Sequence, residues 1–469
     1  MKQDIGVIGL GVMGKSISRN LAQKGFKLSM YNRHVLGTEE KVAERFKATH
    51  LELNNAEAFD DLNLFVNSLE TPRKIILMVN AGNAVDLVLE ELMQHLEKGD
   101  IVLDGGNSHY LDTEQRITTL SKRGFHFLGA GISGGERGAL TGPSIMPSGN
   151  ITAFNEIKPF LEAIAAKDEE GKACCSFVGK EGSGHFVKMI HNGIEYVEMQ
   201  LIAEYYAFLK QHDYTNDQIS ALFESWRDEV GSYLLEISAK ILKLKEDGVH
   251  LLDHILDKAA NKGTGKWSTE VIANSGEAAS LIPSALLARY LSYFKEKREE
   301  AAHLYSISPK KVKFNLKELK EAYQFSRILN HHQGFALIAQ ASQKENWGIK
   351  LGEIARIWSQ GCIIKSDLMR EVKSYLDTHK QLLMHPKVHE TIKCIYPSAQ
   401  KIASTFLEAQ IHAPCLLEAV NFFHGYKTAR SSANLIQAQR DFFGAHTYQK
   451  INDPSDKTYH TDWEQKYLK

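Results

Sequence analysis

Short apolar runs alternate with longer amphipathic segments over about residues 4–178. The apolar runs include Ile5–Ile8, Lys27–Tyr31, Lys74–Val79 and Asp100–Asp104. Such runs, separated by helix-length stretches, are typical of buried and mostly parallel strands joined by crossover helices. The pattern predicts an α/β domain in which a doubly wound sheet carries helices on both faces.

The pattern changes after the glycine-rich stretch Gly179–Gly184. Segments with helical periodicity then continue to about residue 434, which predicts a large all-helical second domain. Residues 435–469 are too few for a domain and too rich in Phe, Tyr and Trp for simple disorder. We therefore expect three parts, 1–178, 179–434 and 435–469, the last being a C-terminal tail that packs on another surface.

The size of the chain agrees with this division, and its overall charge limits the kinds of partner that are expected. The chain has 469 residues, more than one hydrophobic core usually supports. Lys and Arg total 56 against 57 for Asp and Glu, so the overall charge gives no reason to expect nucleic acid or an anionic membrane. The five cysteines lack zinc-like spacing, which favours reduced thiols. With no basic leader and no apolar run of roughly 20 residues, the chain is expected to be cytoplasmic.

A glycine-rich loop follows the first predicted strand directly and leads into a helix-like stretch. It consists of Gly9, Leu10, Gly11, Val12, Met13 and Gly14. The first glycine allows a tight turn, the second admits a pyrophosphate near the backbone, and the third lets helix and strand pack closely. Phosphate then binds free amide groups at the helix start. The loop predicts a dinucleotide site in a Rossmann-like domain; a turn that binds nothing is the alternative.

Polar residues at the end of the second predicted strand favour NADP over NAD. Asn32, Arg33 and His34 stand where an NAD-preferring enzyme usually has an Asp or Glu for the ribose hydroxyls. Asn32 can hydrogen-bond a ribose phosphate, and Arg33 can pair with its charge and lie against the adenine. A solvated Arg33 without such a role is the alternative.

Four polar residues share one face of an otherwise apolar helix. Lys188, His191, Asn192 and Glu195 follow helical spacing, and the apolar residues between them predict a helix buried nearly all round. A desolvated lysine loses its proton more easily and can act as a base, whereas a desolvated carboxyl group can stay protonated and act as an acid. A structural salt bridge between Lys188 and Glu195 is the alternative.

Three further segments are equipped to close such a site. They are Asp104–Ser108, Gly131–Gly135 and Asn261–Trp267. Each combines backbone amides with a hydroxyl, amide or ammonium group, which suits a polyhydroxylated anion. Each alone is more often an ordinary turn, but together with a cofactor loop they indicate a binding site.

These segments, with Leu281–Arg289 and Gln439–His446, resemble the 6-phosphogluconate dehydrogenase family from end to end. The most specific stretches are GISGGERGAL, GHFVKMIHNGIEY and KGTGKW. The resemblance implies NADP-dependent oxidation of 6-phosphogluconate at carbon three, loss of the neighbouring carboxylate as carbon dioxide, and protonation of the enediol to ribulose 5-phosphate. It also implies a homodimer and no requirement for a metal.

The resemblance further implies roles for individual residues. Lys188 matches the general base, which then returns its proton to help decarboxylation, and Glu195 matches the acid that protonates carbon one. Cofactor positions also include Val79, Asn80, Ala81 and Asn107. Positions around the sugar acid are Asn107, Ser133, Gly134, Gly135, His191 and Asn192, and those around its phosphate are Tyr196, Lys262 and Arg289. Arg440 and His446 match tail residues that reach the neighbouring subunit's site.

Three positions depart from the usual family pattern. His34 stands where Thr or Ser is usual, Asn80 where Lys is usual, and Arg137 where an acidic residue is common. None of these changes removes a catalytic group. They concern the strength of the cofactor preference more than the reaction.

Two other functions compete with this interpretation. A 3-hydroxyisobutyrate-type β-hydroxyacid dehydrogenase shares the loop and the lysine, but a small unphosphorylated acid would leave Lys262, Arg289 and Arg440 unpaired at a desolvation cost. A catalytically silent NADP-binding sensor is the second alternative, and the presence of both Lys188 and Glu195 argues against it.

Overall fold

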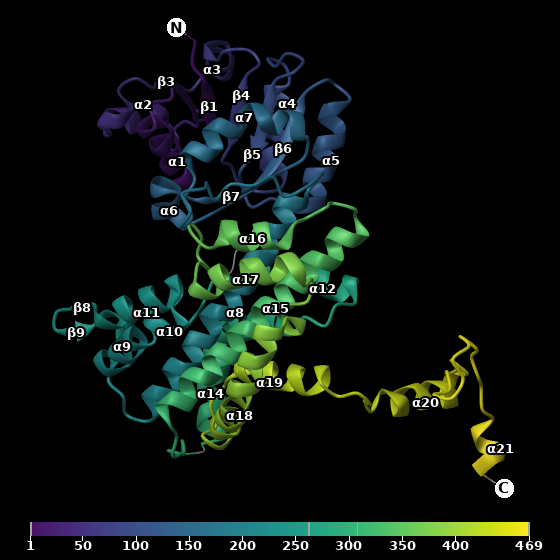
Figure 1. Cartoon of the computed structure of the whole chain (residues 1–469). Helices are drawn as coiled ribbons and strands as arrows, with labels where there is room; N and C mark the ends of the chain where they lie inside the picture. Colours follow the sequence, from purple (N-terminus) through teal and green to yellow (C-terminus); the bar gives the residue numbers. More distant parts are fainter. Residues whose placement is uncertain (1, 261–262, 307, 468–469) are drawn as a thin grey trace. The chain divides into compact units, whose positions relative to one another are not determined.

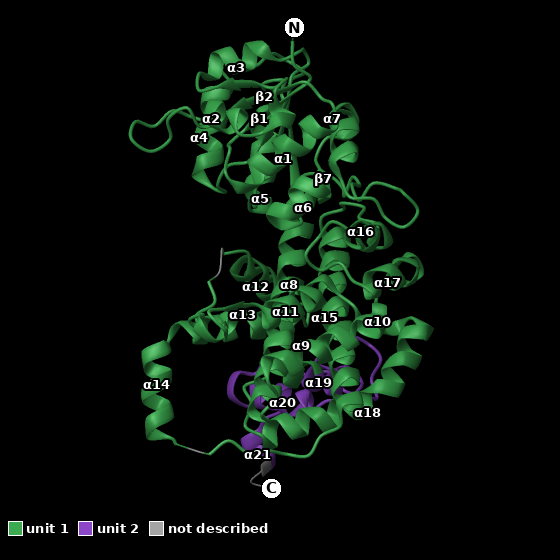
Figure 2. Ribbon diagram, turned by 90° about the vertical axis from the view of Figure 1, so that its left-hand side faces the viewer, with its two compact units in different colours: residues 1–419 green, residues 420–469 purple. Residues whose placement is uncertain are grey.

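The structure is a computed structural model that describes residues 2–260, 263–306 and 308–467. The chain forms two compact units, Met1–Ala419 and Val420–Lys469 (Figure 2). The boundaries proposed at residues 178 and 434 stay predictions.

A seven-stranded sheet lies at the N-terminal end of the first unit, as traced by the described residues (Figure 1). Its order is β3-β2-β1-β4-β5-β6-β7; β7 is antiparallel to β6 and the other neighbours are parallel. This confirms the predicted doubly wound, mostly parallel sheet. The strands are β1 (Ile5–Ile8), β2 (Leu28–Tyr31), β3 (Glu57–Phe59), β4 (Lys74–Leu77), β5 (Ile101–Asp104), β6 (His126–Ser133) and β7 (Ser144–Ser148).

Helices cover both faces of this sheet, and each face has its own apolar core. Neighbouring residues of β4 point to opposite faces, so that Ile76 lies in one core and Ile75 in the other. Burial on both faces explains why the strands read as continuous apolar runs. The helices are α1 (Val12–Gln23), α2 (Val42–Ala48), α3 (Leu62–Ser68), α4 (Asn83–Leu92), α5 (Tyr110–Ser121), α6 (Gly135–Thr141) and α7 (Ile151–Ile164), with a 3₁₀ turn η1 (Leu51–Leu53).

The rest of the first unit is mainly helical and is built around two long helices. These are α8 (Ser183–Gln211) and α15 (Leu316–Lys344), which pack against each other and are buried along most of their length. A side chain on Gly334 of α15 would overlap Ile194 of α8, so the glycine permits this close approach. No described helix combines the length and the apolarity that a membrane crossing needs.

Shorter helices surround this pair. They are α9 (Asn216–Ser225), α10 (Arg227–Val230), α11 (Tyr233–Lys243), α12 (Thr264–Ser275), α13 (Leu281–Tyr293), α14 (Lys295–Leu304), α16 (Leu351–Trp358), α17 (Asp367–Thr378), α18 (Pro386–Glu408) and α19 (Pro414–Tyr426), with 3₁₀ turns η2 (Leu251–His254) and η3 (Leu382–Met384). A small hairpin of β8 (Lys245–Glu246) and β9 (Val249–His250) departs from the all-helical prediction. Asp247 and Gly248 both have positive φ at its turn, which is the conformation that tight hairpins require.

The second unit is folded around a buried carboxylate. Its helices are the end of α19, then α20 (Ala433–Gly444) and α21 (Trp463–Tyr467), and Tyr448 pairs with Tyr459 in a β-bridge. Asp441 on α20 accepts hydrogen bonds from the backbone amides of Thr447 and Thr461. The tail is therefore an ordered element with its own polar centre.

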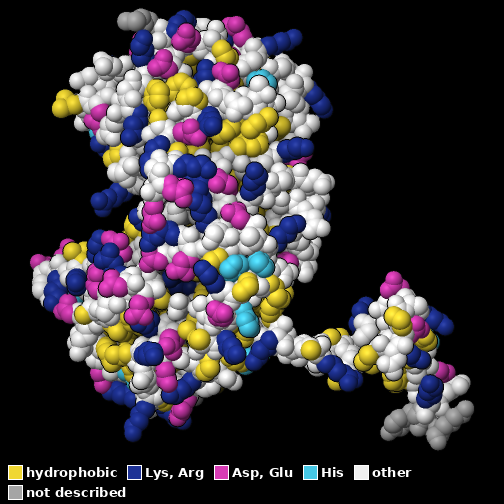
Figure 3. All heavy atoms as spheres, viewed as in Figure 1, with side chains coloured by type: hydrophobic (Ala, Val, Ile, Leu, Met, Phe, Trp, Pro, Cys, Tyr) yellow, Lys and Arg dark blue, Asp and Glu magenta, His cyan; other side chains and the backbone are white. Residues whose placement is uncertain are grey.

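Charged side chains of both signs are mixed on the molecular face drawn in Figure 3. Lys and Arg total 56 and Asp and Glu total 57, so the composition favours neither sign of charge.

Candidate active site

The glycine-rich loop joins β1 to α1, and its three glycines meet different demands. Gly9 has a φ of 92°, and a side chain there would lie 2.7 Å from the Met78 carbonyl oxygen. A side chain on Gly14 would overlap the Gly9 carbonyl. Gly11, in contrast, faces open space, with nothing within 4 Å of an added Cβ. The first and third glycines hold the turn together, and the second leaves the backbone accessible to a pyrophosphate, so the loop fits a dinucleotide.

Asn32 connects this loop to the end of β2. Its Oδ1 accepts a hydrogen bond of 3.0 Å from the Leu10 amide. Val79, Asn80 and Ala81 follow β4, the other neighbour of β1, and Asn80 and Ala81 are exposed. The predicted cofactor residues around the loop therefore lie at one edge of the sheet.

The Arg33 side chain is exposed, and its guanidinium is paired with the carboxylate of Glu39. Its Nη2 lies 2.9 Å from Glu39 Oε1, and Asn32 Nδ2 donates to Glu39 Oε2 at 2.9 Å. Hydrogen bonds from Arg33 and Asn32 hold the pKa of Glu39 below its usual value. Sequence reasoning missed Glu39, because its approach depends on a turn that periodicity does not reveal. His34 is exposed and lies 3.7 Å from Asp60.

Lys188 lies on α8 where this helix crosses β6. A side chain on Gly131 of β6 would overlap the Lys188 Cβ, and one on Gly184 would overlap the Met146 carbonyl of β7. The absence of both side chains lets the helix backbone lie directly against the strands. This contact fixes the distance of Lys188 from the sheet. Only 6% of the surface of the residue is exposed.

The predicted polar stripe forms one connected cluster. Lys188 Nζ lies 3.4 Å from His191 Nδ1, and His191 Nε2 lies 3.2 Å from the Ser133 hydroxyl at the end of β6. Asn192 Oδ1 and Glu195 Oε2 lie 3.3 and 3.7 Å from His191 Nδ1. The rings of Trp358 and His191 pack in a T-shaped arrangement, with centroids 5.3 Å apart. His191 therefore lies at the centre of the cluster, within 3.7 Å of Lys188, Glu195 and the Ser133 hydroxyl.

Burial shifts the pKa values of Lys188 and Glu195 toward each other. It lowers the pKa of the Lys188 amine, with Glu195 and Cys362 opposing the shift, and raises the pKa of Glu195 against the pull of Lys188 and Arg289. Burial also lowers the pKa of His191 well below its usual value. Both shifts are toward the uncharged amine and the protonated carboxyl group, which are the states that a base and an acid need.

Two turns lie at the same edge of the sheet as Ser133. Asp104, at the end of β5, accepts hydrogen bonds from the Gly106 amide at 2.9 Å and the Ser108 hydroxyl at 2.6 Å, and this turn leaves Asn107 exposed. Gly134 and Gly135 follow Ser133 with φ values of 123° and 63°, which only glycine adopts readily. Since β1, β4, β5 and β6 are parallel neighbours, their carboxyl ends bring the cofactor loop and Ser133 to one edge.

Tyr196 and Arg289, two of the three residues predicted around the substrate phosphate, lie in contact with each other. The Arg289 guanidinium lies 3.5 Å from the Tyr196 ring centroid, and the pKa of Arg289 is lowered by burial. Within the described ranges, Arg289 makes no ion pair with a carboxylate, so its charge is available to an anion. Lys262, the third predicted residue, lies outside the described residues.

Arg440 and His446 belong to the second unit. Both are exposed; Arg440 Nη1 donates to Gln437 at 3.1 Å, and the rings of His446 and Phe443 form a T-shaped pair with centroids 5.9 Å apart. Their role at a neighbouring site stays a prediction.

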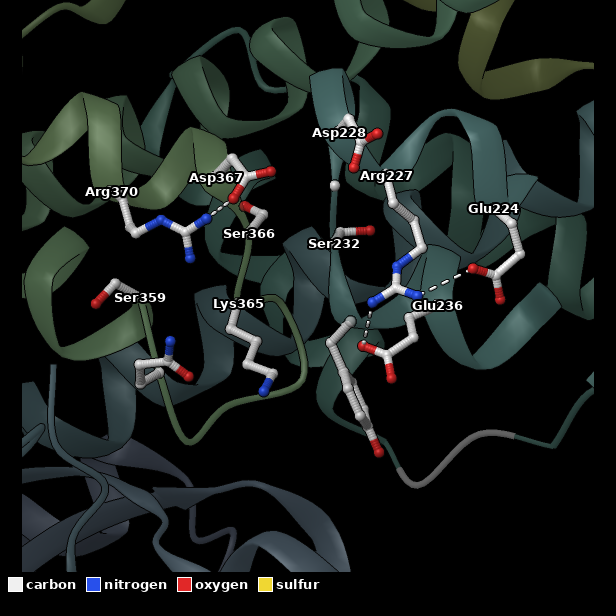
Figure 4. Close-up of a pocket in the computed structure, with 13 residues that line it drawn as sticks. Glu224, Arg227, Asp228, Ser232, Glu236, Ser359, Lys365, Ser366, Asp367 and Arg370 are labelled. Atoms are coloured by element: carbon white, nitrogen blue, oxygen red, sulfur yellow. Dashed lines mark hydrogen bonds and ion pairs between the residues drawn. The ribbon is translucent and has the colours of Figure 1, made fainter. Parts of the chain in front are cut away.

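A polar cavity of about 470 Å³ lies between α9, α11 and the loop before α17 (Figure 4). Its lining includes none of the predicted site residues. Arg227 pairs with Glu224 and Glu236, and Arg370 pairs with Asp367, so these cations are already neutralised. In the part of the chain that the structure describes, no group of three or more His, Cys, Asp or Glu residues could hold a metal ion.

A dinucleotide loop and a buried amine and carboxyl pair in one unit define a nicotinamide-dependent dehydrogenase of hydroxy acids. Two family models match the chain: the NAD binding domain of 6-phosphogluconate dehydrogenase over residues 4–179, and the C-terminal domain of the same enzyme over residues 184–463.

Individual relatives agree with these matches. The decarboxylating 6-phosphogluconate dehydrogenase of Aggregatibacter actinomycetemcomitans is 43% identical, covering 99% of this chain and 97% of that one. The NADP(+)-dependent decarboxylating enzyme of Bacillus subtilis is 42% identical over 98% of this chain and 99% of that one. The solved structure of Plasmodium falciparum 6-phosphogluconate dehydrogenase superposes with a TM-score of 0.93 at 36% identity, covering 98% and 100% of the two chains. The chain belongs to the 6-phosphogluconate dehydrogenase family.

Proposed function

We propose that the chain catalyses the oxidative decarboxylation of 6-phosphogluconate to ribulose 5-phosphate and carbon dioxide with NADP. One observation carries this proposal: Lys188 and Glu195 face one cluster on a buried helix, and burial shifts their pKa values in opposite directions. The Bacillus subtilis relative is named NADP(+)-dependent and decarboxylating, and the Plasmodium falciparum relative was solved with NADP+ and with 6-phosphogluconate.

The family resemblance and the positions of the described site residues support the following binding roles. NADP, when bound, supplies the hydride acceptor. Gly11 and the start of α1 bind its pyrophosphate, and Val79, Asn80, Ala81 and Asn107 lie at the same edge of the sheet. Ser133, Gly134, Gly135, His191 and Asn192 bind the hydroxyl groups and carboxylate of the sugar acid, and Arg289 with Tyr196 and Lys262 binds its phosphate.

The chemical steps need one base and one acid. Uncharged Lys188 accepts the proton of the carbon-three hydroxyl as that carbon is oxidised. The resulting ammonium polarises the new carbonyl and returns the proton to its oxygen as the carboxylate leaves as carbon dioxide. Glu195 then protonates the carbon that becomes C1 of the pentulose, while Lys188 removes the proton from the enediol oxygen. Transfer of that proton back to Glu195 restores both groups.

Replacement of the base tests the proposal. In Lys188→Ala, we expect both reduced cofactor and carbon dioxide to fall by at least about 10³-fold, since general acid–base catalysis contributes typically 10²–10⁴-fold. NADP binding, measured by calorimetry, should change little. Lys122→Ala, an exposed lysine on the end of α5, is the matched control. Substantial turnover by Lys188→Ala, or wild-type turnover of 3-hydroxyisobutyrate in place of 6-phosphogluconate, would refute the assignment.

Three finer features belong to the same proposal. We infer a cytoplasmic enzyme of the pentose phosphate pathway and of gluconate utilisation, supported by five free thiols that are typical of a reducing compartment. We also infer a homodimer in which the tail contributes Arg440 and His446 to the neighbouring site. The exposed apolar side chains of α20 support a packing role for the tail: Leu435, Ile436, Phe442 and Phe443.

A further inference from the structure

A short turn after β2 returns the chain to the cofactor-binding residues. The Val35 amide donates to the Glu39 carbonyl at 3.0 Å, and the Glu39 amide donates to the Val35 carbonyl at 2.8 Å. Gly37, with a φ of 79°, lies at the tip of the turn. This closure brings the Glu39 side chain back against Asn32 and Arg33 and fixes where it lies.

Glu39 engages the donors that a ribose phosphate would use. Its two oxygens lie 2.9 and 3.4 Å from Arg33 Nη2 and Nε, a fork-to-fork contact of the kind that arginine makes with a phosphate. The Asn32 amide nitrogen is 2.9 Å from the same carboxylate. The side chain of Arg33 is 72% exposed, so the pair is accessible from solvent. A phosphate reaching Arg33 must displace this carboxylate or lie beside a second anion.

We propose that Glu39 is a specificity-determining residue of the cofactor site. Its carboxylate competes with the 2′-phosphate of NADP for Arg33 and Asn32, and it accepts a hydrogen bond from the 2′-hydroxyl of NAD without losing its own partners. A carboxylate near the end of the second strand is the usual ribose ligand of NAD-binding domains. Glu39 therefore narrows the preference for NADP over NAD. This inference rests on the nicotinamide cofactor use of the proposed function.

Binding of nucleotide fragments to the full chain isolates this effect from turnover. Calorimetry with adenosine 2′,5′-bisphosphate and with adenosine 5′-monophosphate compares the two ribose chemistries. In Glu39→Gln, we expect the bisphosphate to bind roughly three- to tenfold more tightly, which is the size expected for removal of an exposed ion pair and of the repulsion between two anions. The monophosphate should bind equally or more weakly.

A neighbouring carboxylate provides the matched control. Glu40 accepts a hydrogen bond of 2.7 Å from the Gly37 amide, a bond that Gln also accepts, and among the described residues no contact joins it to Arg33. Glu40→Gln should bind both fragments as the wild type does. In an Arg33→Ala background the gain from Glu39→Gln should disappear, since the competition requires the guanidinium.

Steady-state kinetics give a second readout. The ratio of kcat/KM for NADP to kcat/KM for NAD should rise in Glu39→Gln by the factor seen in fragment binding. An unchanged fragment affinity, an equal gain in Glu40→Gln, or a gain that persists without Arg33 would overturn the proposal. Fragment binding needs no sugar acid. The binding result can therefore be interpreted even if the proposed reaction is wrong.

Discussion

The pKa values of the Lys188 amine and the Glu195 carboxyl group are shifted in opposite directions, and these shifts predict how activity depends on pH. Burial lowers the lysine pKa from 10.5 and raises the glutamate pKa from 4.5, so the pKa of Lys188 lies below 10.5 and that of Glu195 lies above 4.5. As pH rises, kcat/KM should first increase as Lys188 loses its proton and then decrease as Glu195 loses its own. The two limbs describe the coupled pair, so a bell-shaped profile is expected.

Glu195→Gln tells which limb belongs to the carboxyl group. The amide keeps the size and the neutral charge of the protonated acid but has no proton to give. We expect turnover to fall by roughly 10²-fold or more and the alkaline limb to disappear from the residual activity. The pH profile of kcat/KM from pH 5 to 10 is the measurement. An alkaline limb that survives unchanged in Glu195→Gln would show that another group supplies the second proton.

At the scale of elements, the contact between β6 and α8 determines where the lysine lies. In Gly131→Ala, the new methyl group must push against Lys188 Cβ. Overpacking of this kind costs about 1–3 kcal/mol of stability, and a shift of the catalytic group by about 1 Å lowers kcat by up to roughly 100-fold. Thermal unfolding and kcat measured on the same preparation test both effects.

A control substitution at a second glycine distinguishes the effect of crowding from the effect of replacing a glycine as such. An added Cβ on Gly138 of α6 would have its nearest neighbour at 3.9 Å, the Gly361 carbonyl oxygen, which is an ordinary contact. Gly138→Ala should therefore keep kcat within about twofold and leave stability nearly unchanged. If Gly131→Ala behaves in the same way, the close approach of the strand to α8 does not position the lysine.

The elements that sequence patterns predicted are those with a local cause. Each of three patterns can be recognised within a dozen residues: the apolar run Ile5–Ile8, the glycine loop after it and the polar stripe from Lys188 to Glu195. The structure has a strand, a turn and a buried helix at these places. The antiparallel direction of β7 and the contact of Gly131 with Lys188 could not be predicted, because they join residues that are distant in sequence.

Glu39 shows the same limit over a shorter span. It lies only six residues after Arg33, yet its contact depends on the positive φ of Gly37 and on two backbone hydrogen bonds that close the turn. Composition and spacing predicted that Arg33 is a phosphate ligand. They did not show that its guanidinium is already paired with the Glu39 carboxylate. The predicted residues Tyr196 and Arg289 came together as expected, with a cation–π geometry that spacing alone does not specify.

At the scale of the whole molecule, the fold of the tail depends on one carboxylate. Asp441 accepts from the Thr447 and Thr461 amides, from Trp463 Nε1 at 2.9 Å and from His460 Nδ1 at 3.0 Å. Its burial raises the pKa, but these hydrogen bonds outweigh that effect and lower it to about 2. The carboxylate is therefore ionised wherever the enzyme works, and its contribution is lost only as pH falls through about 2.

Asp441→Asn tests whether an ordered tail is needed at the neighbouring site. An amide offers one acceptor oxygen and turns an NH₂ group toward donors, so the α20 to α21 segment should loosen. Because the tail is proposed to bring Arg440 and His446 to the partner, the KM for 6-phosphogluconate should rise by roughly tenfold, as expected when about 1.4 kcal/mol of binding is lost. The KM for NADP and the main thermal transition should change little. Asp456→Asn, an exposed carboxylate in the same tail, should match the wild type. A normal KM for 6-phosphogluconate in Asp441→Asn, together with faster proteolysis of the tail, would show that an ordered tail is not required to bind the sugar acid.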